Sequence, residues 1–512
     1  MISLQKEASD VLSLVKGLRN CSSPVGRLPG DVLERILIMR ALEQDLLTAS
    51  HVCHRWRSIL TSSPRLWTNF QCADVARTLQ YLVRSEPVPI NVSSDFYSDV
   101  QAVIALQPAT DRFVSLTLRL RPFDLLKVFL QLSSPAPVLE SLKVYVSPLV
   151  GGGRTFHPSI PGTFLCGSTP ALKTLHLDGI NTKLNFSEFP ALTHLTFITN
   201  AHTFDMSELF QVFTSARLLE EVTVEFSGPT TLIPESQGIV QLSRMKKLSF
   251  SNTVGKFPER LLSLLDMPSV EGVKLVITLP GGDTRTIRDF LPPRLPNFPH
   301  LLKVDNLKLD VPYAHCNVQF GGPGGTISIH ASRGGGRERN DNFQSHWLDS
   351  LGPMSIVDVK DLTLRNYHPQ ELSAQCPVLK SLRIMDGLRS LVVERCDNAI
   401  VIEALSPAKK GSILSPHLES LMFQLITEPT TIFPGLTGMA QARSRAGFPL
   451  RKVSSDQSTT FRRSDVEALQ CHVDCVQLNM EVGSHSSSPV HPTPCKIVPV
   501  RGFICVAPVS CR

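Results

Sequence analysis

Residues 28–67 read LPGDVLERILIMRALEQDLLTASHVCHRWRSILTSSPRLW, which carries the clearest structural signals in the chain. A residue before proline avoids the helical region and an acidic residue suits a first helical turn, so a helix is expected to begin near Asp31. Apolar residues then recur at helical spacing in three successive segments. The stretch therefore predicts three short helices, which end at Pro64 and are closed by a turn that carries Trp67.

So short a unit buries little core by itself, and we expect it to dock on a partner or a neighbouring domain. Its order of Leu-Pro, acidic first turn, Leu/Ile face, Ala-Ser-x-Val-Cys-x-x-Trp-Arg and Ser-Pro-x-Leu-Trp resembles the F-box. The resemblance implies binding to a Skp-type adaptor, which bridges to a cullin and to a ubiquitin-transfer machinery. It also implies an adaptor-facing surface drawn from Leu28, Pro29, Leu33, Ile36, Leu37, Leu47, Val52, Cys53 and Trp56.

Two questions stay open for this stretch. Three amphipathic helices that end in a tryptophan are also compatible with an ordinary helical cap on a larger domain. The segment 39–44 carries Arg40 and Glu43 where the F-box family often has a proline, so the adaptor contacts at this loop are undefined. Leu66 and Trp67 are expected to close the small core and to pack it on the next domain of the chain.

The composition is that of a soluble protein with more than one domain. The chain has 512 residues, of which 42% are hydrophobic, and a formal net charge of +6. This length exceeds one ordinary core, and no apolar run is long enough to predict a membrane span. The twelve cysteines lack paired spacing, which favours reduced thiols in a cytoplasmic and/or nuclear protein.

Residues 1–22 are predicted to form an amphipathic helix rather than a signal peptide, because Lys6, Glu7 and Asp10 interrupt the apolar residues. We expect this helix to pack beside the F-box. Its apolar face comprises Leu4, Ala8, Val11, Leu12, Val15 and Leu18.

A short pattern recurs from Phe113 onward: an apolar residue, two variable positions, a second apolar residue, one variable position and a third apolar residue. The second and third apolar residues would point to one side of a strand, while the first would tuck the incoming chain beneath it. The triads are Phe113-Leu116-Leu118, Leu139-Leu142-Val144, Leu172-Leu175-Leu177, Leu192-Leu195-Phe197, Leu219-Val222-Val224, Met245-Leu248-Phe250, Val270-Val273-Leu275, Val304-Leu307-Leu309, Val359-Leu362-Leu364, Leu379-Leu382-Ile384, Leu418-Leu421-Phe423 and Val473-Val476-Leu478.

The spacing of these triads resembles the irregular leucine-rich arrays attached to many F-boxes, in which strand plus helix or turn units stack to bury their faces. Unrelated strands of an α/β fold that happen to be rich in leucine remain the alternative. A degenerate unit is predicted at 326–329, interrupted by flexible glycine-rich segments within 321–341. In the segment 379–393, Asp386-Gly387 is compatible with a hairpin turn.

The predicted fold class is α/β, with a three-helix F-box followed by an irregular leucine-rich-repeat solenoid. The domain boundaries follow from where the patterns change. We place the amphipathic helix at 1–22, the F-box at 23–72, the solenoid with its glycine-rich insertion at 73–482, and an unstructured tail at 483–512.

No catalytic constellation, phosphate-binding loop or dinucleotide fingerprint is found, so an enzyme and a cofactor are not expected. Cys471 and Cys475 flank a His-Val-Asp segment, but no second ligand pair accompanies them at zinc-site spacing. The basic run at 333–339 is partly neutralised by neighbouring acids, which disfavours nucleic-acid binding.

The expected function is that of a substrate-recognition subunit of an SCF-type ubiquitin ligase, with an unidentified protein as substrate. The alternatives are a non-catalytic scaffold that binds the adaptor without promoting ubiquitination and, less favoured, an enzyme hidden in the repeats. The substrate face would be the concave strand surface, because its variable positions are mixed in charge. These positions include Lys173, Thr174, His176, Thr193, His194, Thr196, Glu221, Thr223, Lys360, Thr363, Arg383, Glu419 and Met422.

Overall fold

The computed structural model divides into two compact units, residues 1–232 and 233–512, each of which is described by itself. The described residues are 5–8, 11–12, 15–16, 19, 23–40, 43–147, 160–161, 164–180, 189–199, 206–226, 238–253, 257–279, 290–291, 304–311, 315–333, 358–366, 382, 385–407, 413–424, 429–458, 463–479, 498–500 and 503–506. Among the described helices, none combines the length and the apolar character that a membrane span requires.

The first unit begins with a helical module that matches the expected three helices. Leu33, Leu37, Leu46 and Leu60 are buried and form its small core, which Trp67 closes with 0% of its surface exposed. The elements of the module are η1 (Val25–Arg27), α2 (Gly30–Arg40), α3 (Glu43–Ser50), α4 (His54–Ser62) and η2 (Pro64–Trp67).

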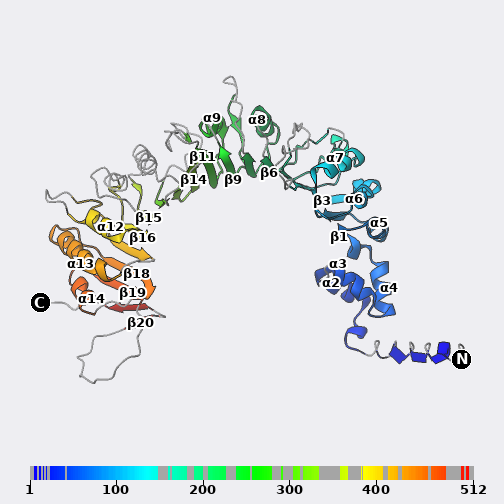
Figure 1. Ribbon diagram of the computed structural model, residues 1–512, viewed down its shortest axis with the longest axis horizontal. Coiled ribbons are helices and arrows are strands. Elements are labelled where there is room, and N and C mark those ends of the chain that lie inside the picture. Colours follow the sequence, from blue (N-terminus) through cyan, green and yellow to red (C-terminus); the bar gives the residue numbers. More distant parts are fainter. Residues whose placement is uncertain are drawn as a thin grey trace. The chain divides into compact units, whose positions relative to one another are not determined.

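A run of parallel strands comes next, in which each strand pairs with the following one along the chain. Helices α5, α6 and α7 lie along one side of these strands (Figure 1). The strands are β1 (Asn69–Cys72), β2 (Ile90–Ser94), β3 (Phe113–Leu120), β4 (Ser141–Val146), β5 (Thr174–Asp178), β6 (His194–Thr199) and β7 (Glu221–Phe226). The helical segments are α5 (Val75–Arg84), α6 (Val100–Ile104), η3 (Gln107–Arg112), α7 (Pro122–Gln131), η4 (Phe164–Gly167) and α8 (Met206–Ser215).

The apolar triads explain this sheet. In β3, Leu116 and Leu118 are fully buried and alternate with more exposed residues, and Leu116 pairs in register with Leu142 of β4. The same alternation continues through β7, so one face of the sheet is apolar and the other is left for polar side chains. Every triad predicted in this unit lies at a strand. The strands β1 and β2 precede the first predicted triad and were not anticipated.

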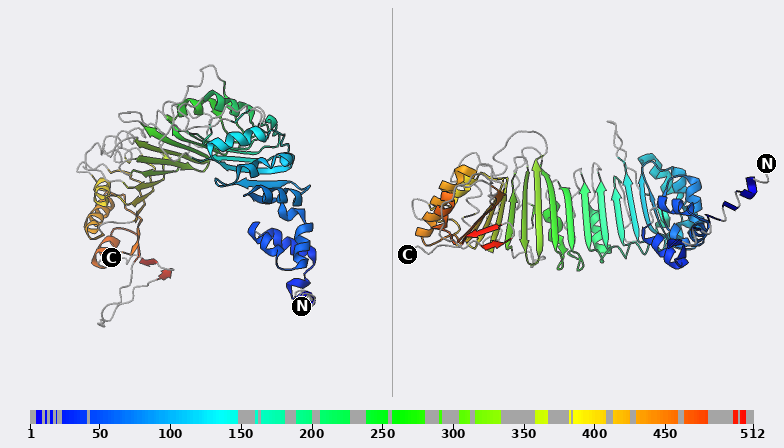
Figure 2. Two further views of the ribbon diagram at one scale, coloured as in Figure 1. Left: turned by 45° about the vertical axis from the view of Figure 1, so that its right-hand side comes forward. Right: turned by 90° about the horizontal axis from the view of Figure 1, so that it is seen from below.

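The second unit contains a longer series of strands, which lie side by side (Figure 2). Its strands are β8 (Val240–Gln241), β9 (Lys247–Thr253), β10 (Leu265–Asp266), β11 (Gly272–Leu279), β12 (Asn306–Asp310), β13 (His315–Gly322), β14 (Gly325–Arg333), β15 (Asp361–Arg365), β16 (Ser390–Glu394), β17 (Ser420–Gln424), β18 (Lys452–Ser458), β19 (Cys475–Asn479), β20 (Val498–Val500) and β21 (Phe503–Val506). Its helices are α9 (Phe257–Leu264), α12 (Asn398–Leu405), α13 (Pro429–Arg445) and α14 (Arg463–Gln470).

Pairing in this unit is parallel through β9, β11 and β14 and again from β12 through β15 to β19. One strand, β13, runs antiparallel between β14 and β12 and joins the two parallel runs. The predicted strand at 326–329 lies within β14. The flexible loop predicted at 321–325 is wrong, because Gly322 pairs with Gly325 in a β-hairpin. Gly325 has a φ of +140°, and a Cβ there would collide with the carbonyl oxygen of Glu271, which explains the glycine.

The predicted hairpin at Asp386-Gly387 is also corrected. These two residues form a turn, but the following strand β16 pairs in parallel with β15 and β17. The apolar triad of β16 is Leu388-Leu391-Val393, whose members are all buried. The predicted triad at 379–384 lies outside the described residues except for Leu382, which is buried and helical.

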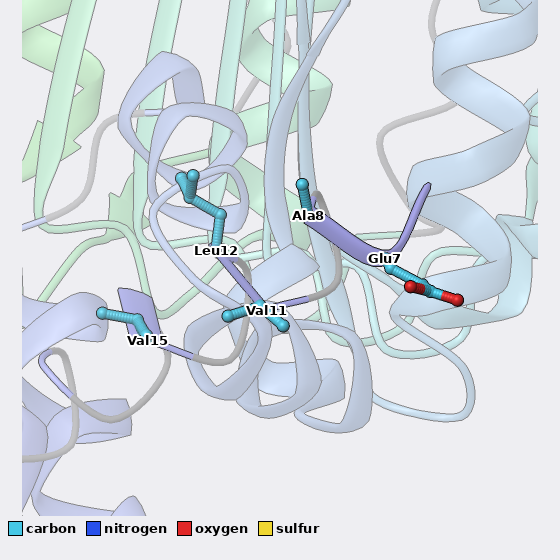
Figure 3. A pocket seen from close by; sticks show the side chains of 5 residues that line it. All are labelled: Glu7, Ala8, Val11, Leu12 and Val15. Carbon is cyan, nitrogen blue, oxygen red and sulfur yellow. The ribbon is translucent and has the colours of Figure 1, made fainter. Parts of the chain in front are cut away.

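The ends of the chain differ from expectation. Val11, Leu12 and Val15 are exposed, so the described part of the N-terminal helix does not pack its apolar face on the module. With Glu7 and Ala8, these side chains line a shallow apolar hollow (Figure 3).

In the predicted unstructured tail, β21 pairs antiparallel with β19 and with β20. The phenylalanine, isoleucine and valine of β21 and the two valines of β20 favour strands. The other tail residues lie outside the described ones.

A buried arginine connects helix α13 of the second unit to the loop that precedes β17. Arg443 on α13 has 0% of its surface exposed and donates to the carbonyl oxygens of Leu414, at 3.0 Å, and Ser415, at 2.9 Å. Burial lowers the pKa of this guanidinium to about 10. The arginine therefore fastens α13 to the loop that leads into β17.

Arg443→Met should lower the free energy of unfolding of this unit by about 2–3 kcal/mol, because buried carbonyl oxygens lose their donors. Urea denaturation of the full chain, followed by hydrogen exchange in α13 and β17, measures this loss. Arg451→Met, at an exposed arginine that follows the same helix, is the matched control and should leave the stability nearly unchanged. Equal stability of the two variants would contradict the assigned role.

Candidate interaction surfaces

The helical module places the predicted adaptor-facing residues in three different environments. Pro29, Ile36 and Val52 are exposed. Leu28, Leu47, Cys53 and Trp56 are half-buried. Leu33 and Leu37 are only 1% and 8% exposed, so their prediction as contact residues is revised, and they belong to the core of the module.

Helix α2 carries two apolar rows, which explains this division. Leu33 and Leu37, four residues apart, point into the core. Val32, Ile36 and Met39 follow one another at spacings of four and three residues on the outer side, and we call this row the α2 stripe. Ile36 is 38% exposed and Met39 is 74% exposed. Val32 and Met39 were missed as contact candidates, although their helical spacing from Ile36 was visible in the sequence.

Two arginines of α4 donate hydrogen bonds to backbone carbonyl oxygens of neighbouring segments of the module. Arg55 donates from both terminal nitrogens of its guanidinium to the carbonyl oxygens of Gly26 and Leu28. These hydrogen bonds link the residues that precede α2 to α4. The Nε of Arg57 donates to the carbonyl oxygen of Ser50 at 2.9 Å and fixes the turn between α3 and α4. Arg57 itself is exposed, which leaves its charge available at the surface.

The strand face of the first unit brings together most of the predicted substrate-facing residues. Thr174, His194 and Glu221 are paired in register across β5, β6 and β7. His176, Thr196 and Thr223 form the next row on the same face. Lys173 precedes β5 and forms an ion pair with Glu140 at 2.9 Å, and Thr193 donates to the carbonyl oxygen of Lys173 at 3.0 Å.

The predicted residues of the second unit form a separate and sparser group. Thr363 and Met422 lie in the same row, with Val392 of β16 between them. Lys360 pairs with Asp305 at 3.8 Å, and Glu419 pairs with Arg451 at 3.5 Å, so both charges are partly neutralised. Arg383 lies outside the described residues.

His176 is the most unusual of these side chains. Its ring centroid lies 4.6 Å from that of Tyr145, and its buried Nε2 has no hydrogen-bond partner among the described residues. Burial, with the nearby charge of Lys143, lowers the pKa of the imidazole. The ring is therefore favoured in its neutral form at neutral pH.

The cysteines and histidines of the described segments give no sign of a metal site or of an activated thiol. Within the described ranges, no three His, Cys, Asp or Glu side chains come together as metal ligands, and Cys471 is exposed while Cys475 lies half-buried in β19. Burial raises the pKa of the Cys316 thiol to about 12, and this disfavours the reactive thiolate. The rings of His315 and His330 lie 5.5 Å apart across the β13–β14 hairpin.

Comparison with known proteins identifies the N-terminal module. The F-box-like family matches residues 25–73, which covers η1, the three helices, η2 and β1. No curated protein matches the chain in a sequence search.

Proposed function

We propose that this chain, which carries an F-box-like domain at residues 25–73, is a substrate-recognition subunit of an SCF-type ubiquitin ligase. F-box domains commonly bind Skp-type adaptors. In this proposal the module binds such an adaptor and, through it, a cullin, while the strand face holds a protein substrate. The chain performs no bond chemistry itself and works in the cytoplasm and/or nucleus.

The observation that carries the proposal is the α2 stripe within the matched domain. A helix that already buries Leu33 and Leu37 also exposes a row of apolar side chains on its outer side. Contiguous exposed apolar surface on a small soluble module is typical of a protein interface. The half-buried Trp56 adds an aromatic side chain of the type that dominates binding energy.

We infer further that the strands form irregular leucine-rich-repeat units. Parallel pairing of successive strands, a buried apolar triad at each of the strands β3 to β7 and a polar opposite face support this inference. An α/β sheet unrelated to such repeats is the alternative. Stacked units would give the chain an extended polar face for protein recognition.

The proposed subunit acts by proximity. Binding the substrate and the adaptor in one chain raises the effective concentration of substrate lysines near a charged ubiquitin carrier. Because binding already holds the substrate near the carrier, the transfer step loses less translational and rotational entropy. The receptor needs no catalytic residue for this effect.

Affinity capture of the full chain tests the proposal, with the adaptor and the cullin quantified in the captured material. Trp56→Ala should weaken adaptor binding by about 2 kcal/mol, or roughly 30-fold, because a buried aromatic contact is lost. Tyr97→Ala removes an exposed aromatic ring outside the domain and should leave capture unchanged. Absence of the adaptor from the intact chain's captured material would refute the proposal.

The scaffold alternative shares adaptor binding but delivers no substrate. Proteins captured with the intact chain should then show the same half-life in cells that contain either the intact chain or Trp56→Ala. A substrate receptor predicts that at least one captured protein is stabilised by Trp56→Ala. This comparison separates the two functions.

A further inference from the structure

Six charged, aromatic and histidine side chains gather on the polar face of the first unit, away from its apolar face. They lie on strands β3, β4, β5 and β7 and alternate with buried residues of the same strands. We call this set the charged face, and it comprises Arg119, Lys143, Tyr145, His176, Asp178 and Glu225.

One end of the charged face is cationic and aromatic. The guanidinium carbon of Arg119 lies 5.0 Å from the centroid of the Tyr145 ring, which in turn packs against His176. Lys143 lies beside His176 in the register of β4 and β5. Among the described residues no carboxylate forms an ion pair with Lys143 or Arg119, so both charges remain available to a ligand.

The other end is acidic. Asp178 of β5 and Glu225 of β7 flank Ile198 of β6 in one row of paired residues. Partial burial and the charge of Glu225 both raise the pKa of Asp178, which shows that the two carboxylates interact unfavourably. Within the described part of the chain, neither carboxylate has a basic partner. A cation placed over Ile198 would relieve this repulsion, and the alkyl stem of a lysine or arginine would contact the isoleucine.

The distance between the two ends sets the geometry of a ligand. Arg119 on β3 and Ile198 on β6, over which the basic group would lie, belong to one row of paired residues and are three strand spacings apart, or about 14 Å at roughly 4.8 Å per spacing. An extended peptide advances about 3.3 Å per residue, so about four residues bridge this separation. A peptide that crosses the strands can therefore reach both ends with two of its side chains.

We propose that the charged face binds an extended peptide segment that carries one acidic and one basic side chain about four residues apart. The acidic group lies at Arg119 and Lys143, and the basic group lies between Asp178 and Glu225. The ring of His176, packed against Tyr145, lies between the two ends. The inference rests on the proposed function, because it specifies the kind of substrate segment that the receptor recognises.

The test is selection of a phage-displayed random peptide library on the full chain in complex with its adaptor. The intact chain should enrich acidic–basic pairs at this spacing by about tenfold over the same pairs at adjacent positions. Asp178→Lys with Glu225→Lys should remove this preference and enrich peptides with two acidic residues instead. Such a reversal distinguishes recognition from a merely structural role of the two carboxylates.

The matched control is Glu86→Gln with Asp124→Asn, which removes two carboxylates outside the charged face and should leave the selected peptides unchanged. Selection of the same peptides by the intact chain and the Lys variant would overturn the inference, as would a lack of any enriched charge pair. Adaptor binding is measured on the same preparations. Failure of adaptor binding contradicts the proposed function, whereas normal adaptor binding without charge-pair selection contradicts the peptide inference alone.

Discussion

An Ile36→Asp, Met39→Asp double variant is expected to weaken adaptor binding at least about 100-fold, or by roughly 3 kcal/mol. The two side chains belong to the α2 stripe and point away from the core that Leu33 and Leu37 form. In the proposed complex they are buried against the adaptor, so each aspartate would leave an unpaired charge at an apolar interface. Isothermal titration calorimetry with purified full chain and adaptor measures the loss.

The control is Leu79→Asp with Val83→Asp, at two exposed apolar residues of α5 outside the F-box-like domain. It adds the same charges to a helix surface and should bind the adaptor as tightly as the intact chain. Both variants should unfold at temperatures close to that of the intact chain, because the replaced side chains are exposed. Equal affinity of the two double variants for the adaptor would contradict the assigned surface.

Trp67→Ala is expected to lower the free energy of unfolding of the first unit by about 4 kcal/mol. The indole is fully buried, and its Nε1 donates to the carbonyl oxygen of Leu60 at 2.6 Å. Its ring contacts Tyr81 edge-on at 5.1 Å, and the guanidinium carbon of Arg84 lies 4.3 Å from its centroid. Trp67 thus joins the helical module to α5, and its loss leaves a cavity at this junction.

Urea denaturation of the full chain, monitored by circular dichroism, measures this effect. Trp67→Phe is the informative comparison because it keeps an apolar ring but loses the indole N–H, and it should be less destabilising than Trp67→Ala. Hydrogen exchange in α4 and α5 should report the loosened junction in the alanine variant. A loss of stability below about 1 kcal/mol for Trp67→Ala would contradict this role.

Local patterns accounted for much of the fold. Helices α2 to α4 follow from proline placement and helical spacing, and β3 to β7 follow from apolar residues two positions apart. The antiparallel strand β13 was not foreseen, because its pairing with β12 and β14 depends on the rest of the sheet rather than on its own residues. The glycine-rich sequence at 321–325 predicts a loop. The close approach of the Glu271 backbone to Gly325, which explains the glycine within the hairpin, is not visible in the sequence.

The candidate surfaces were predicted less completely than the fold. Val32, Leu33, Ile36 and Leu37 recur at helical spacing in the sequence and suggest one apolar face, whereas α2 directs alternate members of this group inward and outward. Only packing against α4 and Trp67 decides which row is the core. The charged face depends on strand register, which brings together residues far apart in the sequence, such as Arg119 and Glu225.

Hydrogen–deuterium exchange of the full chain, with and without purified Skp-type adaptor, tests the central claim most directly. The proposed function predicts that the adaptor slows exchange in peptides from residues 25–62, including α2 and α4, and leaves the strands of both units unchanged. Unaltered exchange in this region at saturating adaptor, or protection confined to the strands, would contradict an adaptor-binding F-box-like domain.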